Sequence, residues 1–151
     1  PAFAETLRNH PDIQLKLIIP TYPRNLFKRI MGLIDELKIR GSIKLKHDLP
    51  TDELLKEVAS SSCVVIPSHS EGFCFTAVET MAMRVPVIHS GLGALPEVVG
   101  GRSISLDELS VQSLASAMNA AIMGQWKVVE EKKFPIGDTV SNYLKLYREM
   151  L

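Results

Sequence analysis

The 151-residue sequence lacks most of the features that mark specialised protein classes. Its two cysteines, Cys63 and Cys74, provide neither a disulfide framework nor a paired Cys-x-x-Cys metal site. Lys plus Arg and Asp plus Glu number 17 each, which argues against nucleic acid or an anionic membrane as the main partner. No apolar run reaches the ~18 residues of a membrane-spanning helix, and the acid-containing first segment does not resemble a signal peptide. These absences predict a cytoplasmic protein.

What the sequence does contain is a balanced globular composition. The length fits one domain, and the 46% of hydrophobic residues is enough for a sizeable core. The first ten residues, "PAFAETLRNH", look like part of a helix already under way. We therefore expect residues 1–151 to be one domain that starts inside a larger protein.

Short apolar runs alternate with helical patterns along most of the chain. The runs predict strands within residues 13–20, 41–48, 62–68, 85–90 and 102–106, with 62–68 fully buried. The patterns predict helices at 2–9, 24–39, 51–61, 75–84 and 107–124, a Gly-rich turn with a short helix in 91–101, and two helices after residue 125. Thr51 is the expected N-terminal cap of its helix. Asp107 lies near the expected cap of the last of these five helices, and Gly124 follows its end.

This alternation predicts an α/β fold, a Rossmann-like doubly wound parallel sheet with helices on both faces. In such sheets, ligands bind beyond the carboxyl ends of the strands. The loops expected there contain the unusual residues of the chain, in "PTYPRN", "KHDLPT", "PSHSEGF" and "HSGLGAL". We therefore expect the functional site among these loops.

The segment "EGFCFTAVE" places a carboxylate on each side of a predicted helix start. Gly72 lets the backbone come close to a ligand, and the free amides of a helix beginning near Phe75 favour a phosphate or diphosphate. Glu79, one turn inside that helix, would accept hydrogen bonds from hydroxyls such as those of a ribose, and Glu71 would face a second hydroxylated group. From this segment alone, Glu71 and Glu79 can also be interpreted as solvated surface residues without a ligand.

The surrounding residues resemble the C-terminal domain of retaining GT-B-fold glycosyltransferases, the glycosyl transferases group 1 family. The resemblance rests on Pro67-Ser68, Glu71-Gly72-Phe73, Glu79, Met81-Ala82, Pro86-Val87-Ile88 and Pro96-Glu97-Val98-Val99, in that order. It is detailed over residues 47–100 and covers 2–125 in the order of elements. It implies a hexosyltransferase of polysaccharide or glycoconjugate biosynthesis that uses a nucleotide-diphosphate sugar, without a cofactor or metal.

The resemblance also implies roles for individual residues. Glu71 corresponds to the catalytic glutamate at the donor sugar, and Glu79 to the glutamate that holds the ribose. The donor-binding backbone corresponds to Gly72, Phe73, Cys74, Phe75 and Thr76. His47 lies in the loop expected near the base, and Gly91 and Gly93 lie in a turn that approaches the sugar in the family. A sugar, glycan or lipid-linked acceptor would be bound by an N-terminal domain, which would give the full-length protein peripheral contact with a membrane where the acceptor is lipid-linked.

The chain departs from the family pattern at three places. Cys74 stands where the family usually has glycine, and Arg84-Val85 replaces a smaller pair. The phosphate-binding Arg and Lys of the family come from a first strand and loop that would precede Pro1. The N-terminal acceptor domain is outside these residues as well, so we expect the 151 residues alone to fold without turning over donor.

Other residues have both functional and structural interpretations. His69 and His89 either contact the donor or stabilise their turns, and Cys74 is better explained by packing than as a nucleophile. The four histidines do not have the spacing of a metal site. Two other function classes stay open, a sugar-nucleotide epimerase of related fold and a non-catalytic α/β interaction module.

Overall fold

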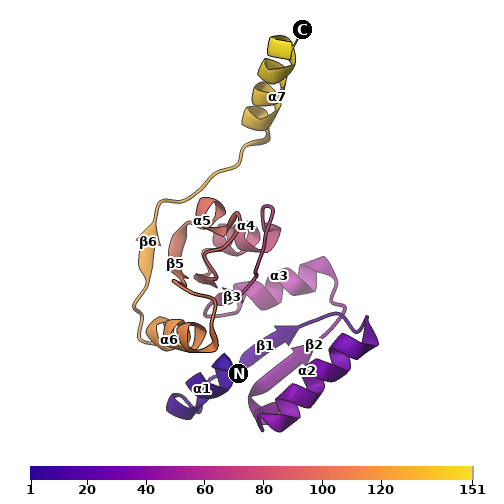
Figure 1. Cartoon of the computed structure of the whole chain (residues 1–151), viewed down its shortest axis with the longest axis vertical. Coiled ribbons are helices and arrows are strands. Elements are labelled where there is room, and N and C mark those ends of the chain that lie inside the picture. The colour runs from indigo at the N-terminus through magenta and orange to yellow at the C-terminus, as the bar shows by residue number, and fades with distance from the viewer. Residues whose placement is uncertain (151) are drawn as a thin grey trace.

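The computed structural model describes residues 1–150 as alternating helices and short strands. The helices are α1 (Ala2–Asn9), α2 (Arg24–Glu36), α3 (Thr51–Ala59), α4 (Phe75–Ala82), α5 (Leu95–Val98), α6 (Val111–Ile122) and α7 (Ile136–Met150). The strands are β1 (Leu15–Ile18), β2 (Ile43–Lys46), β3 (Val64–Ile66), β4 (Val87–His89), β5 (Gly101–Ser105) and β6 (Lys127–Val129), and a 3₁₀ turn (Arg40–Ser42) precedes β2. In Figure 1 all elements except α7 form one body, and α7 stands away from it at the end of an extended segment.

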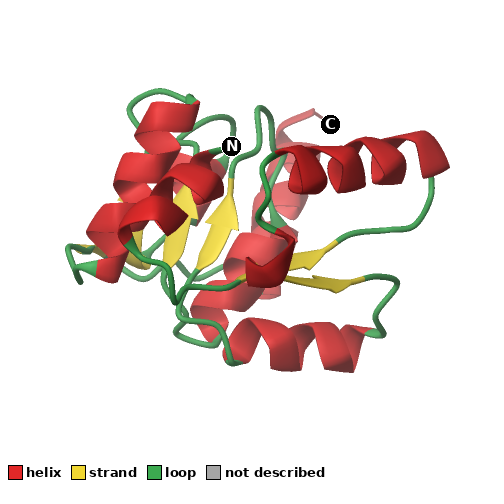
Figure 2. Cartoon of the chain, turned by 90° about the horizontal axis from the view of Figure 1, so that it is seen from below, coloured by secondary structure: helices red, strands yellow, loops and turns green. Residues whose placement is uncertain are grey.

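The strands form two sheets, which Figure 2 shows as two separate groups of strands. In the first, β1 and β2 are parallel, and Leu15 lies opposite Ile43. In the second, β3, β4 and β5 are parallel neighbours, and β6 adds an antiparallel edge. The α/β class and the parallel pairing are therefore as predicted, but the sheet is divided between β1 and β3.

Two cavities lie beside this division. The smaller has a volume of about 470 Å³ and the larger about 940 Å³. Both are lined by Leu15 and Leu17 of β1, Val65 of β3 and Met118 of α6. The apolar side chains that face the division are consequently only half-buried.

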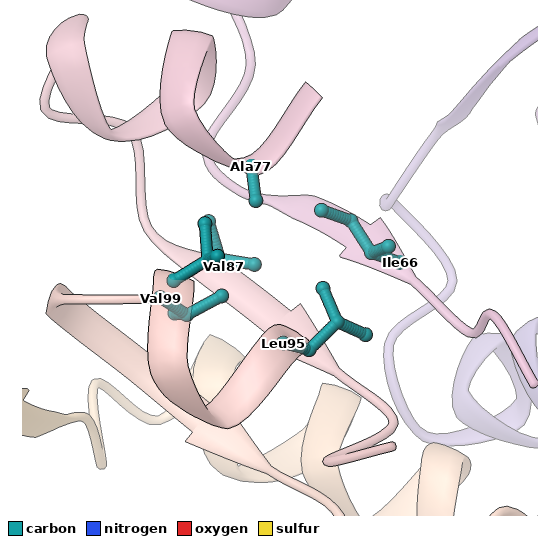
Figure 3. Packing of buried hydrophobic residues seen from close by; sticks show 6 residues of the cluster. Ile66, Ala77, Val87, Leu95 and Val99 are labelled. Carbon is teal, nitrogen blue, oxygen red and sulfur yellow. The ribbon is translucent and has the colours of Figure 1, made fainter. Parts of the chain in front are cut away.

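The best-packed core lies in the second sheet. Figure 3 shows Ala77 of α4, Leu95 of α5 and Ile66 of β3 pointing toward Val87 of β4. Val87, Ala77 and Leu95 are almost inaccessible to solvent, as are all three residues of β4. This core fixes the start of α4 relative to the ends of β3 and β4.

A second core lies beneath β1 and β2. Phe3 of α1, Ile34 of α2 and Ile39 are its buried members, and half-buried aliphatic residues of both strands pack around them. A third cluster places Ile88 of β4 against α6, and α6 also contacts α1. Helices therefore cover both faces of the sheets, as the doubly wound pattern predicts.

The predictions for the starts of two helices are wrong. Pro50 holds the cap position of α3, and Thr51 is the first helical residue with no side-chain capping bond. The fixed backbone angle of proline suits a residue that leads into a helix. Likewise α6 begins at Val111, because the Ser110 hydroxyl accepts a hydrogen bond of 3.1 Å from the Ser113 N–H, and Asp107 lies outside the helix.

Two other predictions need correction. The tail contains one strand and one helix, because residues 127–129 pair with β5 instead of forming a helix. The segment 62–68 is not fully buried, since only Ile66 of β3 is buried. One edge of β3 faces the division between the sheets, and this leaves Val64 and Val65 half-exposed.

Candidate functional site

The predicted site lies in the loop between β3 and α4, at the carboxyl end of β3. Two hydrogen bonds connect this loop to the turn that follows β4. The Ser90 hydroxyl donates to the Ser68 carbonyl oxygen at 2.6 Å, and the Ala94 N–H donates to the Glu71 carbonyl oxygen at 3.0 Å. The backbone of Glu71 is therefore fixed by a neighbouring turn and does not depend on its own side chain for its position.

Helix α4 begins at Phe75, as the sequence predicts. Its cap residue, Cys74, has a φ of 71°, and no side chain of the described residues caps this helix. The Phe75 side chain is 72% exposed, so solvent reaches the helix start. The first amides of a helix have no partner inside it and carry a partial positive charge, which suits an anionic group.

The two glutamates lie on opposite sides of this helix start in sequence, but the structure does not bring them into one cavity. Glu79 is exposed on α4 and lines the larger cavity together with Thr76 and Thr80. Glu71 is half-buried in its loop and lines neither of the two cavities. A ligand that meets both side chains would have to pass over the exposed start of α4.

Cys74 is a packing residue in this structure. Its side chain is half-buried against the core that contains Ala77 and Val87. Burial raises the pKa of the Cys74 thiol, and the nearby Glu71 carboxylate also raises it. A nucleophilic cysteine needs a lowered pKa, so the environment disfavours the thiolate. Its backbone angle explains why glycine is the usual residue at this position of the family pattern.

The histidines divide between two environments. His89 ends β4, is 5% exposed, and its Nδ1 accepts a 3.2 Å hydrogen bond from the Gly91 N–H. Burial lowers the pKa of His89, which favours the neutral ring that this bond requires. His69 is exposed at the rim of the smaller cavity, and His47 lies edge-to-face with Phe27 of α2 in the other sheet group.

Gly91 and Gly93 both have a positive φ, at 74° and 59°. A Cβ on Gly91 would lie 2.7 Å from the Ser105 hydroxyl, and a Cβ on Gly93 would lie 2.7 Å from the Glu71 carbonyl oxygen. These two glycines therefore allow close approach between parts of the protein. Their expected approach to a donor sugar stays a prediction.

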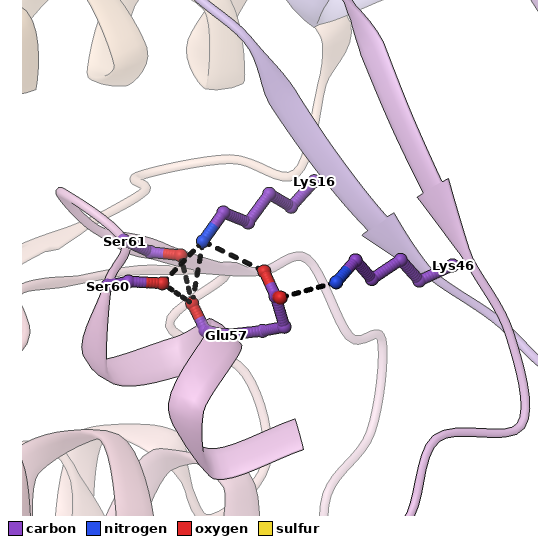
Figure 4. Close-up of polar contacts among 5 residues, drawn as sticks. All are labelled: Lys16, Lys46, Glu57, Ser60 and Ser61. Carbon is purple, nitrogen blue, oxygen red and sulfur yellow. Dashed lines mark hydrogen bonds and ion pairs between the residues drawn. The ribbon is translucent and has the colours of Figure 1, made fainter. Parts of the chain in front are cut away.

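An ion-pair cluster that the sequence reading missed joins α3 to both strands of the β1–β2 sheet. Glu57 of α3 contacts Lys16 of β1 at 3.0 Å and also pairs with Lys46 of β2 (Figure 4). The Lys16 ammonium also donates to the Ser60 hydroxyl at 2.7 Å. Hydrogen bonds from Lys46 and then Lys16 lower the pKa of Glu57 to about 2. The signal was present in the lysines that alternate with apolar residues along both strands.

A second feature that was missed is an aromatic contact between the tail and the site loop. Phe73 lies edge-to-face with Phe75, at 5.2 Å between ring centroids, and with Phe134, at 5.0 Å. The backbone of residues 130–132 also passes so close to Gly100 that a Cβ there would lie 2.4 Å from the Glu130 carbonyl oxygen. The segment before α7 is therefore seated on the body next to the site.

Metal ligation and membrane insertion can be assessed only for the part of the chain that the structure describes. Within residues 1–150, no three His, Cys, Asp or Glu side chains are arranged to hold a metal ion. The expectation that the reaction needs no metal stays a prediction. None of the helices up to Met150 combines the length and the apolar character needed to cross a bilayer.

The sequence profile of the family described as glycosyl transferases group 1 matches residues 2–133. The chain belongs to this family. The match covers every element from α1 to β6, including both sheet groups and the loop that carries Glu71. It agrees with the resemblance seen in the motifs from Pro67 to Val99, and it leaves α7 outside the matched region.

Individual relatives carry glycosyltransferase names. An MMP alpha-(1->4)-mannosyltransferase of Mycolicibacterium hassiacum is 39% identical over 94 residues, which are 62% of this chain and 22% of the relative. A D-inositol 3-phosphate glycosyltransferase of Segniliparus rotundus is 26% identical over an alignment of 161 residues, which covers 99% of this chain and 36% of the relative. The chain thus spans about a fifth to a third of the length of these curated relatives.

Solved structures show that the fold is shared with glycosyltransferases. Sucrose-phosphate synthase from Thermosynechococcus elongatus superposes with a TM-score of 0.71 at 23% identity, over 81% of this chain and 32% of that protein. A lipopolysaccharide outer core galactosyltransferase superposes with a TM-score of 0.63 at 16% identity, over 87% of this chain and 37% of that protein. The architecture is that of the C-terminal domain of a GT-B-fold glycosyltransferase.

Proposed function

We propose that these residues form the donor-binding part of an enzyme that moves a sugar from a nucleotide-diphosphate sugar to an acceptor hydroxyl, with retention of configuration. The observation that carries the proposal is the exposed, uncapped start of α4 at Phe75, with Glu71 before it and Glu79 inside it. Membership of the glycosyl transferases group 1 family supports it. The named relatives are glycosyltransferases, which favours this function over an epimerase or a non-catalytic module.

Each part of the ligand has a proposed position. The diphosphate lies at the free amides of Phe75 and Thr76, where the helix dipole and the unpaired N–H groups stabilise negative charge. Glu79 accepts hydrogen bonds from the ribose hydroxyls, and Glu71 accepts them from the sugar. The backbone of residues 72–74 lines the path between the two.

In the proposed reaction, the acceptor oxygen bonds to the anomeric carbon as the bond from that carbon to the diphosphate breaks. The acceptor proton leaves with the diphosphate, which departs as an anion. The start of α4 stabilises the developing charge, and cationic side chains supplied outside residues 1–151 add to it. We propose that the reaction takes no metal and no cofactor and that it occurs in the cytoplasm.

We also propose that one further strand completes the sheet between β1 and β3, and that an N-terminal domain binds the acceptor. Among the described strands, β1 pairs only with β2, and β3 borders only β4. Both facing edges have unpaired backbone groups, and the cavities beside them are lined by apolar side chains such as Leu17 and Val65. A buried strand with apolar residues on both faces matches this environment.

The donor site is tested by titrating the chain with UDP, GDP and ADP and their hexose conjugates, followed by calorimetry and NMR. We expect one base to be preferred and the shifts to lie in residues 70–80. Glu79→Ala should weaken binding of the preferred nucleotide about tenfold or more, because it removes charge-assisted hydrogen bonds. Glu53→Ala on the exposed face of α3 is the matched control and should bind like the parent chain. Shifts confined to other regions, or a Glu79→Ala variant with unchanged affinity, would contradict the proposal.

The missing strand is tested by hydrogen exchange. We expect the amides of β1 and β3 to become more protected in the full-length protein than in residues 1–151, because a strand between them would pair with both edges. The amides of β4, which already pair on both sides, serve as the internal control. Equal exchange of β1 and β3 in the two proteins would show that no strand occupies this position.

A further inference from the structure

The turn that follows β4, residues 90–94, holds the loop that carries Glu71. It is itself fixed at the sheet, because the Gly91 N–H donates to His89 Nδ1 and the Leu106 N–H donates to the His89 carbonyl oxygen at 2.9 Å. It is also seated against the end of β5, since a Cβ on Gly91 would lie 3.0 Å from the Leu106 carbonyl oxygen. The turn is therefore a rigid surface that extends from the best-packed part of the protein.

Gly93 makes the closest approach to Glu71. A Cβ at this position would lie 2.7 Å from the Glu71 carbonyl oxygen and 2.8 Å from its amide nitrogen. Ordinary van der Waals contact begins near 3.4 Å, so any larger residue would displace the Glu71 backbone. The φ of 59° also favours glycine, and the adjacent Ala94 N–H donates to the same carbonyl oxygen.

Ser90 attaches the same turn to the loop a second time, at Ser68, which lies three residues before Glu71. It is 2% exposed, and its hydroxyl donates to the Ser68 carbonyl oxygen at 2.6 Å while it accepts from the Leu92 N–H at 3.3 Å. Its own N–H donates to the Ile66 carbonyl oxygen and extends the pairing of β3 with β4. Both ends of the segment 68–71 are thus attached to the same turn.

We propose that Gly93 and Ser90 are positioning residues for Glu71. They fix its backbone from the turn after β4, and so determine where its carboxylate meets the ligand. The inference rests on the proposed function for the ligand itself, since Glu71 is the group assigned there to the sugar. It adds that the two ends of the ligand depend on different elements. Binding of the nucleotide depends on α4 and Glu79, and only binding of the sugar depends on this turn.

The experiment compares Gly93→Ala with Gly124→Ala. Gly124 follows α6 with a φ of 73°, and a Cβ there would meet nothing within 4 Å, so it reproduces the backbone strain without the contact. In the ligand-free chain we expect Gly93→Ala to shift the Glu71 amide resonance and to speed exchange of the Ala94 amide. Gly124→Ala should leave both unchanged. An unchanged Glu71 resonance in Gly93→Ala would overturn the inference.

Binding then shows whether the effect reaches the ligand. We expect Gly93→Ala to lower the affinity for the preferred nucleotide-diphosphate hexose about tenfold or more, and to leave the affinity for the bare nucleoside diphosphate nearly unchanged. In a Glu71→Ala background, Gly93→Ala should have no further effect on the hexose conjugate. An equal loss for both ligands, or a further loss in that background, would show that Gly93 does not act through Glu71.

Ser90→Ala keeps the inference testable if Gly93→Ala does not fold. It removes the hydrogen bonds to the Ser68 carbonyl oxygen and from the Leu92 N–H without adding an atom. It should reduce the affinity for the hexose conjugate by a smaller factor in the same selective way. If Glu71→Ala itself binds the conjugate like the parent chain, the proposed function fails at Glu71. The amide measurements would then still show whether Gly93 fixes the Glu71 backbone, so the two failures are distinguishable.

Discussion

The two sheet groups contain similar residues but are buried to different degrees. All three residues of β4 are buried, whereas all four residues of β1 are only half-buried. Both strands are rich in aliphatic side chains, so composition does not explain the difference. β4 has a strand on each side, and β1 has one on a single side among the described strands. Burial here depends on the number of neighbouring strands more than on the hydrophobicity of the strand.

The β1–β2 group compensates with polar contacts. Glu57 bridges Lys16 and Lys46 and so ties α3 to both strands (Figure 4). Its side chain is 20% exposed, and partly exposed ion pairs stabilise proteins only modestly. We therefore expect the β3–β6 group to contribute most of the free energy of unfolding, and the following predictions test that difference.

The largest effect is expected from truncation of buried side chains. Ile88→Ala in β4 removes a fully buried side chain and should lower the free energy of unfolding by about 2–5 kcal/mol. Leu17→Ala in β1 should cost roughly 1–2 kcal/mol, because Leu17 already borders two cavities and loses fewer contacts. Urea unfolding of both variants measures the difference. Equal losses would show that the two groups are equally well packed.

A smaller effect is expected at two helix ends, one in each group. Lys38 after α2 and Arg84 after α4 have φ values of 56° and 57°, in the left-handed position that glycine fills best. Lys38→Gly and Arg84→Gly should each raise the free energy of unfolding by about 0.5–1 kcal/mol, because the strain is removed. Gly124→Ala, at the corresponding position after α6, should have the opposite effect.

Comparison of these two variants sharpens the contrast between the groups. Thermal unfolding should show the same gain for both if the whole body unfolds in one cooperative transition. A gain for Arg84→Gly alone would mean that the β1–β2 group unfolds separately from the rest. Loss of stability in both variants would contradict the explanation by backbone strain.

The smallest effect is expected from the ion-pair cluster, and it depends on pH. The native pKa of Glu57 is about 2, below its ordinary value of 4.5, so the unfolded chain binds more protons between these values. The contribution of Glu57 to stability is therefore complete above about pH 4.5 and disappears as the pH falls toward 2. Glu57→Gln should lower the melting temperature slightly at pH 7, and the difference from the parent chain should vanish near pH 2. A difference that stays constant over this range would show that the charge of Glu57 is not responsible.

Much of the fold follows from local patterns in the sequence. Proline residues mark the ends of β1 and β3, and the helical stripes place α2, α4 and α6 within a few residues of their observed bounds. The errors occur where a choice depends on distant partners. Residues 127–129 form a strand because β5 has a free edge for them, which no local pattern indicates. The cap of α3 is Pro50 and not Thr51, and α6 starts after Ser110 instead of near Asp107.

The candidate site shows the same division between local and distant information. The start of α4 at Phe75 and its position after β3 follow from the motif around Glu71. The contacts that fix this loop come from Ser90 and Gly93, more than 15 residues away in the chain, and depend on how β4 pairs with β3. Sequence spacing thus identified which residues gather near the helix start, but the turn that holds them became visible only in three dimensions.

The contact between Phe134 and Phe73 restricts the position of the last helix, α7. Only Pro135 separates Phe134 from Ile136, where α7 begins, and two residues of extended chain span at most about 7 Å. Figure 1 shows α7 leading away from the body from that point, with Val140, Tyr143 and Leu144 among its exposed apolar side chains. Any surface that α7 packs against must consequently lie close to the loop that carries Glu71, because only a short stretch of chain connects the two.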